Sequence, residues 1–186
     1  MQVYNVRRIV RESILVIVIC IVLDLQAGVL LDLNLNSFLQ WTALLLLIPS
    51  YLAMGGNIGT ILGSRLTSAL YLGTIEPKFL KWTKTAKENL AASLLLGLYA
   101  FFFVGIVTFV TSVFLGLSFP DVGKLILLTV VSGFLLIVCL SLLTFFTAIL
   151  AFRRGLDPDN IIAPIIATSG DLIGAVIFVA LLPILF

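Results

Sequence analysis

Long runs of apolar residues, separated by short polar stretches, fill the chain from end to end. A helix needs about 20 residues to cross the ~30 Å hydrocarbon core of a bilayer. Five segments reach this length, with ends placed to within several residues: 13–31, 38–66, 90–116, 123–151 and 161–185. The pattern therefore predicts an all-α integral membrane protein with five transmembrane helices.

Proline and glycine interrupt the second segment. Pro49 is followed by Gly55, Gly59 and Gly63, and the spacing of four is typical of helices that pack closely together. The same residues also predict a helix that is bent or broken at Pro49 and the glycines, with backbone carbonyls turned toward a cavity. Asn57 lies among these glycines and would bring an amide oxygen to that place.

The composition supports a membrane environment. Hydrophobic residues make up 61% of the 186 residues and charged residues 11%, whereas a soluble domain carries roughly a quarter charged residues. The first apolar run follows three arginines, as in a signal peptide, but it lacks a small-x-small cleavage site. We therefore expect a multi-pass protein of the cell membrane that keeps its first span.

The basic residues are distributed unequally between the two sides of the predicted helices. Ten of the eleven fall in the N-terminal segment and in the connections after the second and fourth spans, and Lys124 is the exception. The positive-inside rule then predicts an N-terminus inside and a C-terminus outside. Copies of such a chain point the same way, so an oligomer would be parallel, with its axis along the membrane normal.

Four lysines recur every three residues beside Trp82 at one predicted interface: Lys78, Lys81, Lys84 and Lys87. Long basic side chains at such a place extend toward anionic lipid head groups. We expect membrane lipids as partners, together with a second copy of the chain, and no nucleic acid.

The chain offers only oxygen ligands to a metal. It has no histidine, and Cys20 and Cys139 lie far apart in apolar runs. These residues exclude a soft-metal site and favour a hard cation such as Mg²⁺ or Ca²⁺. No nucleophile–base pair is recognisable either, so we do not expect an enzyme.

Two carboxylates fall inside predicted spans. Asp171 lies about 20 Å along its helix from Asp157, and an ionised side chain at that depth costs at least ~2.5 kcal/mol. No basic residue is predicted at the same depth to neutralise it. Asp24, midway along the first span, is either a second pathway carboxylate or a helix–helix contact, and the sequence leaves both open.

Mg²⁺ gives up its water reluctantly and usually contacts only one or two carboxylates. Two copies of Asp171 facing each other across a dimer axis would repel, and a divalent cation would relieve that repulsion. Thr168 adds a hydroxyl oxygen one turn before Asp171. The alternative is a membrane scaffold that transports nothing, in which the glycines serve packing and Asp171 is protonated.

Two motifs carry a resemblance to a known family. The run "GLDPDNIIAPIIATSGD" resembles the last-helix segment of MgtE-type magnesium channels and of the related eukaryotic solute-carrier magnesium transporters. Its matching features are Asp157-Pro158, Pro164, Ala167-Thr168 and Asp171. The run "GGNIGTILGSRLTSALYLG" resembles the second-helix signature, with Gly56-Asn57 at its centre and Ser64-Arg65-Leu66 closer to the solute-carrier version.

The resemblance implies a homodimer of five-span subunits that passes Mg²⁺ along the dimer axis, as a channel or a transporter. It implies that Asp171 binds the cation in the pore, with Asp157 at the cytoplasmic mouth and Asn57 near the central site. The chain departs from the bacterial pattern at Ile61, where those members often have glutamine, and at Ala163, where they often have asparagine.

The bacterial channels also carry large cytosolic domains that sense magnesium. We expect residues 1–186 to form a single transmembrane domain without such a regulatory domain. Gating of that kind is then absent or depends on a separate regulatory subunit.

Overall fold

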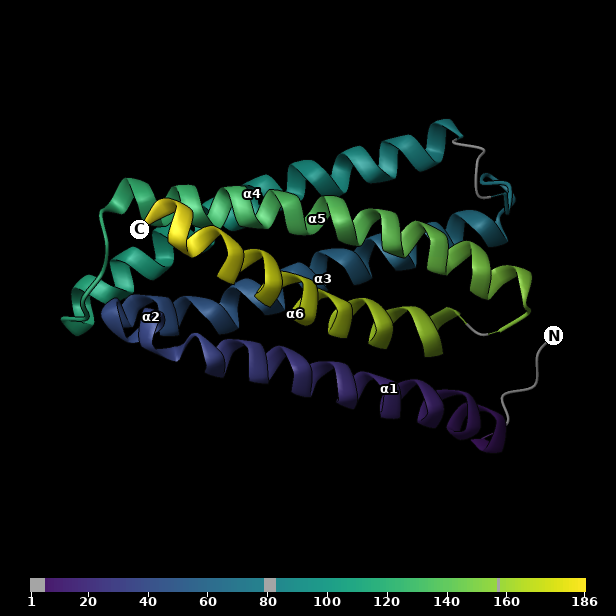
Figure 1. Ribbon diagram of the computed structural model, residues 1–186. Helices are drawn as coiled ribbons and strands as arrows, with labels where there is room; N and C mark the ends of the chain where they lie inside the picture. The colour runs from purple at the N-terminus through teal and green to yellow at the C-terminus, as the bar shows by residue number, and fades with distance from the viewer. Residues whose placement is uncertain (1–5, 79–82, 157) are drawn as a thin grey trace.

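The computed structural model describes residues 6–78, 83–156 and 158–186. Within these ranges every element of regular secondary structure is a helix (Figure 1). The helices are α1 (Val6–Leu33), α2 (Leu35–Gln40), α3 (Thr42–Tyr71), α4 (Lys84–Leu115), α5 (Val122–Arg153) and α6 (Pro158–Leu185). Five of them, all except α2, are long and apolar enough to cross a membrane, which confirms the five predicted spans.

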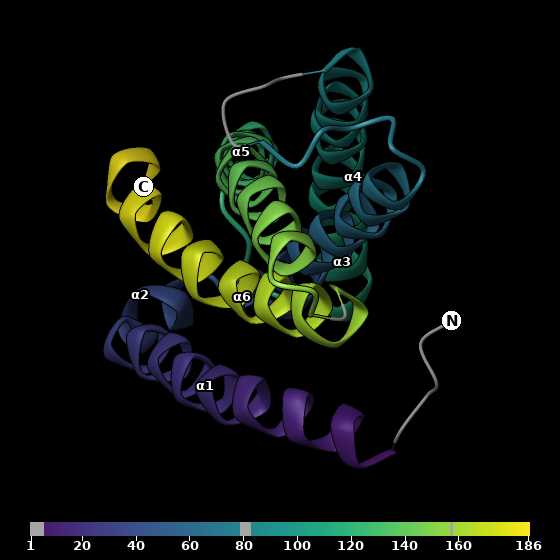
Figure 2. The same cartoon turned by 90° about the vertical axis from the view of Figure 1, so that its right-hand side faces the viewer.

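The long helices run side by side in alternating directions, and α6 occupies the centre of the arrangement (Figure 1). It packs against α1, α3 and α5, while α3 also packs against α4 and α5. Among the described elements, α1 packs only against α6 and the short α2. Figure 2 shows the consequence, since α1 lies along one side of the bundle and most of its circumference faces outward.

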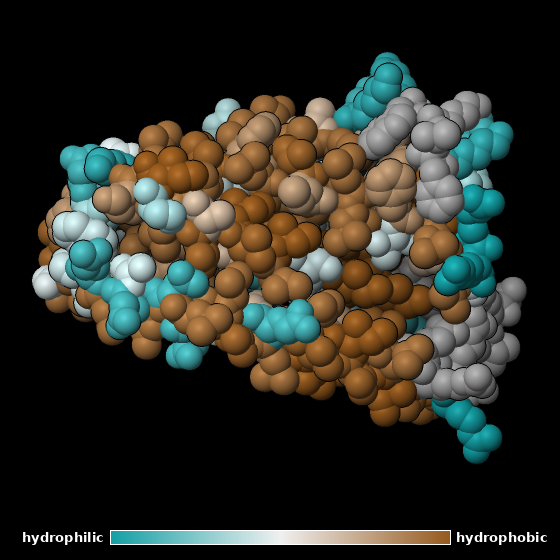
Figure 3. Space-filling view, viewed as in Figure 1, coloured by the Kyte–Doolittle hydropathy of each residue, from teal (hydrophilic) through white to brown (hydrophobic). Residues whose placement is uncertain are grey.

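The alternation gathers the basic segments at one end of the molecule. The starts of α1, α4 and α6 and the ends of α3 and α5 lie at that end (Figure 1). Figure 3 shows hydrophilic residues at both ends and a mainly hydrophobic band between them, crossed by a small hydrophilic patch. The molecule thus has the surface of a protein whose middle contacts lipid.

Local capping defines where several helices begin and end. The Thr83 hydroxyl accepts a hydrogen bond from the Ala86 N–H at 3.3 Å, and the Asp121 carboxylate accepts one from the Lys124 N–H at 3.2 Å. Gly116 ends α4 with a left-handed φ of 64°, a conformation that favours glycine. Each cap satisfies backbone groups that a helix end leaves without partners.

The second span begins at Thr42, four residues after the predicted start near Phe38 and within the several residues allowed for the span ends. Trp41 has an extended backbone (φ −130°, ψ 94°), which separates α2 from α3. Phe38 belongs to α2, and its buried ring lies 6.2 Å from that of Phe178 on α6. The N-terminus of α3 is capped by a loop that is distant in the sequence. There the Ser118 hydroxyl accepts a hydrogen bond from the Thr42 N–H at 3.0 Å.

The second span was predicted to be bent or broken, and it is not broken, because α3 is continuous through Pro49 and the glycines. A Cβ built on Gly55 would meet Leu136 of α5, and one on Gly59 would meet Ile166 of α6. Gly63 faces Ile162 of α6 in the same way. The packing interpretation of these glycines is confirmed, since their missing side chains make room for neighbouring helices.

Candidate cation site

The backbones of α3 and α6 touch at the middle of both helices. A Cβ built on Gly170 would lie 3.2 Å from the backbone nitrogen of Gly56. A Cβ built on Gly56 would lie 3.2 Å from the Cα of Ala167. These contacts are between main chains, whereas the neighbouring glycines of α3 contact side chains. They fix Gly56 and Gly170 at the same level of the bundle.

This contact determines where Asn57 and Asp171 lie. Each follows a contact glycine by one residue, and a helix turns by about 100° per residue. Because α3 and α6 run in opposite directions (Figure 1), this rotation brings both side chains out on the same side of the contact. Asn57 is exposed and Asp171 is half-buried in the single subunit. An amide and a carboxylate therefore leave the bundle at one level and on one side.

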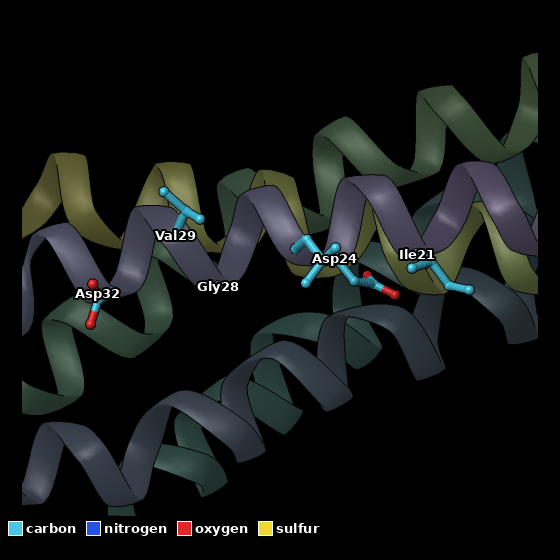
Figure 4. Close-up of a pocket in the computed structure, with 6 residues that line it drawn as sticks. Ile21, Asp24, Gly28, Val29 and Asp32 are labelled. Atoms are coloured by element: carbon cyan, nitrogen blue, oxygen red, sulfur yellow. The ribbon is translucent and has the colours of Figure 1, made fainter.

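A second carboxylate reaches the same place from α1. Asp24 lies in the middle of α1 and is exposed, and it is close enough to Asp171 for the two carboxylates to interact electrostatically. Figure 4 shows Asp24 on α1, with Asp32 two turns further along the helix. An open depression along this face is lined by Ile21, Asp24, Leu25, Gly28, Val29 and Asp32. The sequence left the role of Asp24 open, and the structure places it within electrostatic range of Asp171.

Thr168 and Asp157 differ from these three residues. Thr168 is only 5% exposed, so its side chain is buried within the subunit rather than on the outer side of the α3–α6 contact. Asp157 lies outside the described residues. The described part of the chain contains no group of three or more His, Cys, Asp or Glu side chains that could hold a metal ion.

The outer side of α3 continues beyond Asn57 with Thr60 and Ile61. The Thr60 hydroxyl donates a hydrogen bond to the backbone carbonyl of Asn57 at 2.9 Å, so this hydroxyl is engaged with its own helix. Ile61, a departure from the bacterial pattern, is 44% exposed one turn after Asn57. Ala163, the other departure, is also exposed. The surface that carries Asn57 is therefore apolar at both of these positions.

Sequence reasoning missed the two contact glycines as a pair. It noted Gly56 only as part of a motif and did not single out Gly170. The signal was present, because the two candidate residues each follow a glycine, in "GGN" and in "SGD". A repeated glycine before two residues of similar chemistry indicates a close approach that positions both.

These observations define a multi-pass membrane protein with oxygen-bearing side chains near the middle of three spans. The sequence matches the MgtE family, described as divalent cation transporters, over residues 48–181. The match covers more than half of the chain, from Ile48 in α3 to Leu181 in α6. The chain belongs to the MgtE family.

Curated proteins give a consistent result. The chain is 32% identical to solute carrier family 41 member 3 of Mus musculus over 179 residues, which is 88% of this chain and 36% of that protein. It is 27% identical to solute carrier family 41 member 2 of Gallus gallus, over 79% of this chain and 26% of that protein. Solute carrier family 41 member 2 of Homo sapiens is 28% identical, over 80% of this chain and 26% of that protein. The chain thus spans between a quarter and roughly a third of these relatives.

Proposed function

We propose that this chain transports divalent cations, and Mg²⁺ first among them, across a membrane by way of Asp171. The observation that carries the proposal is the placement of Asp171, Asn57 and Asp24 at the middle of three spans, in a chain of the MgtE family. Membership in a family described as divalent cation transporters supports the class of cargo.

The chemistry of the three side chains suits a hydrated cation. Mg²⁺ retains several waters and accepts one or two carboxylates as direct ligands. Asp24 and Asp171 repel one another when no cation is present, and a divalent cation between them turns that repulsion into two attractions. The Asn57 amide adds a neutral oxygen that can contact the ion or its water. The site therefore favours a divalent cation over an empty state.

We further propose that two copies form a parallel dimer with the cation path on its axis. In each subunit Asn57 and Asp171 leave the bundle on its outer side, where a second copy could bring an identical pair. The gathering of ten of the eleven basic residues at one end supports a single orientation, with that end inside. Parallel copies related by an axis along the membrane normal would meet with their Asp171 side chains at equal depth.

The test is Mg²⁺ uptake into sealed liposomes that contain purified protein. We expect uptake by the wild type and its loss in Asp171→Asn, which keeps the size of the side chain and removes its charge. Glu88→Gln is the matched control, because it also turns a carboxylate into an amide, at an exposed position near the start of α4 that lies outside the candidate site. It should retain uptake near the wild-type rate.

Equal uptake by the wild type and Asp171→Asn would remove Asp171 from the ion path. Uptake lost equally in Asp171→Asn and Glu88→Gln would indicate a general effect of negative charge rather than a site. If correctly folded wild type passes no divalent cation at all, the proposal fails and the scaffold alternative, with a protonated Asp171, replaces it.

A further inference from the structure

The contact between Gly56 and Gly170 lies next to two candidate ligands, Asn57 and Asp171. Of the contact glycines between α3 and α6, these two meet backbone atoms, at 3.2 Å for an added Cβ, whereas Gly59 and Gly63 meet isoleucine side chains first. They also stand directly before Asn57 and Asp171 in the sequence. The closest approach of the two main chains therefore lies next to both candidate ligands.

A side chain at either glycine could not be accommodated by a rotamer change. An isoleucine can rotate away from a new methyl group, but a helix backbone can move only as a segment. At 3.2 Å the neighbour must give by a few tenths of an ångström, so an alanine at position 170 would separate α3 from α6. Asn57 and Asp171, one residue further on, would separate with them.

We propose that Gly56 and Gly170 are positioning residues that set the distance between Asn57 and Asp171. This inference rests on the proposed function for its effect on transport, and on the helix contact alone for its effect on distance. The two glycines touch no ion. They act by holding an amide and a carboxylate at the separation at which both serve the same hydrated cation.

The transport test compares Gly170→Ala and Gly56→Ala with the wild type in the liposome assay. Changes to residues that orient a metal ligand typically lower metal affinity by about 10- to 100-fold. We expect the Mg²⁺ concentration for half-maximal uptake to rise about tenfold, with a smaller change in the maximal rate. Gly170→Ser should have a similar effect, and Gly170→Val a larger one, because the effect follows the size of the added group.

Gly97→Ala is the matched control. A Cβ on Gly97 would lie 2.8 Å from the Cγ1 of Ile137 and 3.3 Å from its Cβ, which a rotamer change does not move, so this site between α4 and α5 is comparably crowded. Neither helix carries a candidate ligand. A merely structural effect would lower the maximal rate in Gly97→Ala and Gly170→Ala alike. The proposal requires the half-maximal concentration to change in Gly170→Ala and to stay at the wild-type value in Gly97→Ala.

A second measurement reports the distance without any transport. Cysteines are placed at positions 57 and 171 after Cys20 and Cys139 are replaced by alanine, and a short bis(methanethiosulfonate) reagent joins them, forming a disulfide to each cysteine with loss of methanesulfinate. Mass spectrometry of the digested protein then gives the rate of cross-linking within one chain. We expect this rate to fall when Gly170→Ala is added and to stay unchanged with Gly97→Ala.

The two measurements separate the two proposals. If the wild type passes no ions, the proposed function fails, while the cross-linking rates still decide whether the glycines set the distance. If the wild type transports, unchanged half-maximal concentrations in both Gly170→Ala and Gly56→Ala overturn the inference. Unchanged cross-linking in Gly170→Ala overturns it as well.

Discussion

The two contacts that α6 makes on either side of Asp171 are built differently. Toward α3, glycines bring the main chains together, and the contact glycines Gly56, Gly59 and Gly170 are buried. Toward α1, the interacting helix keeps most of its large side chains exposed, and among its described side chains only Cys20 and Ala27 are buried. Asp171 thus lies between α3, which packs against three other long helices, and α1, which packs against α6 along one face.

The difference bears on which pair of candidate ligands is held firmly. The main-chain contact between Gly56 and Gly170 restricts the separation of Asn57 and Asp171, which follow these glycines in the sequence. Asp24 reaches Asp171 from a helix that packs, within the described structure, only against α6 and α2. A helix with few buried apolar contacts moves at lower free-energy cost than a buried one. The Asp24–Asp171 distance is therefore expected to vary before the Asn57–Asp171 distance does.

The largest expected effect comes from filling the contact between Gly56 and Gly170. Gly170→Leu places a large side chain against the backbone of Gly56, and overpacking of this kind costs about 1–3 kcal/mol or more. Gly28→Leu on α1 makes the same chemical change where an added Cβ meets nothing within 4 Å. We expect Gly170→Leu to lower the thermal unfolding temperature in detergent strongly and Gly28→Leu to leave it unchanged or raise it.

A comparable fall in the thermal unfolding temperature of Gly28→Leu would contradict the difference between the α3 and α1 contacts of α6. It would mean that the exposed face of α1 is covered by something outside this subunit, such as a second copy. The same unfolding measurement at several protein concentrations would identify that case, because the stability of an oligomer depends on concentration.

The intermediate effect is expected for Asp24→Asn. Removing one of two repelling carboxylates leaves Asp171 as the sole charged ligand of the subunit, so a divalent cation loses one attraction. We expect the half-maximal Mg²⁺ concentration for uptake to rise about tenfold, while Asp171→Asn abolishes uptake. A complete loss in Asp24→Asn would make the two carboxylates equivalent, and an unchanged value would return Asp24 to a packing role.

The smallest effect is expected for Thr168→Val. Thr168 remains a predicted ligand, but its side chain is 5% exposed and offers a single neutral oxygen. The loss of one such interaction is worth about 1 kcal/mol, or roughly fivefold in affinity. Thr168→Ser keeps the hydroxyl and should restore wild-type uptake. If Thr168→Val has no effect on the half-maximal concentration, the hydroxyl is not a ligand.

The sequence was sufficient for the five spans because each apolar run is long enough by itself to cross a bilayer. It was also sufficient for the packing role of Gly55, Gly59 and Gly63, whose spacing alone indicates a helix face. The exact start of α3 was not predicted because Trp41 and Ser118 determine it. Ser118 is far away in the sequence, and an apolar pattern contains no information on such a partner.

The candidate site was predictable only in part. Asp171, Asp24 and Asn57 stood out as polar residues at membrane depth, each judged within its own helix. Asp24 interacts electrostatically with Asp171, and Gly56 contacts Gly170. Both relations depend on which helices are neighbours, and the sequence does not show this. The buried position of Thr168 could not be foreseen either, because it depends on the packing around α6.

The most direct test of the central role of Asp171 is the binding of divalent cations. Mn²⁺ can serve as the probe, because its electron paramagnetic resonance signal distinguishes free from bound ion in a titration of the purified protein. We predict tightly bound Mn²⁺ that Mg²⁺ displaces and that is absent in Asp171→Asn. Tight binding that is unchanged in Asp171→Asn would contradict the role of Asp171.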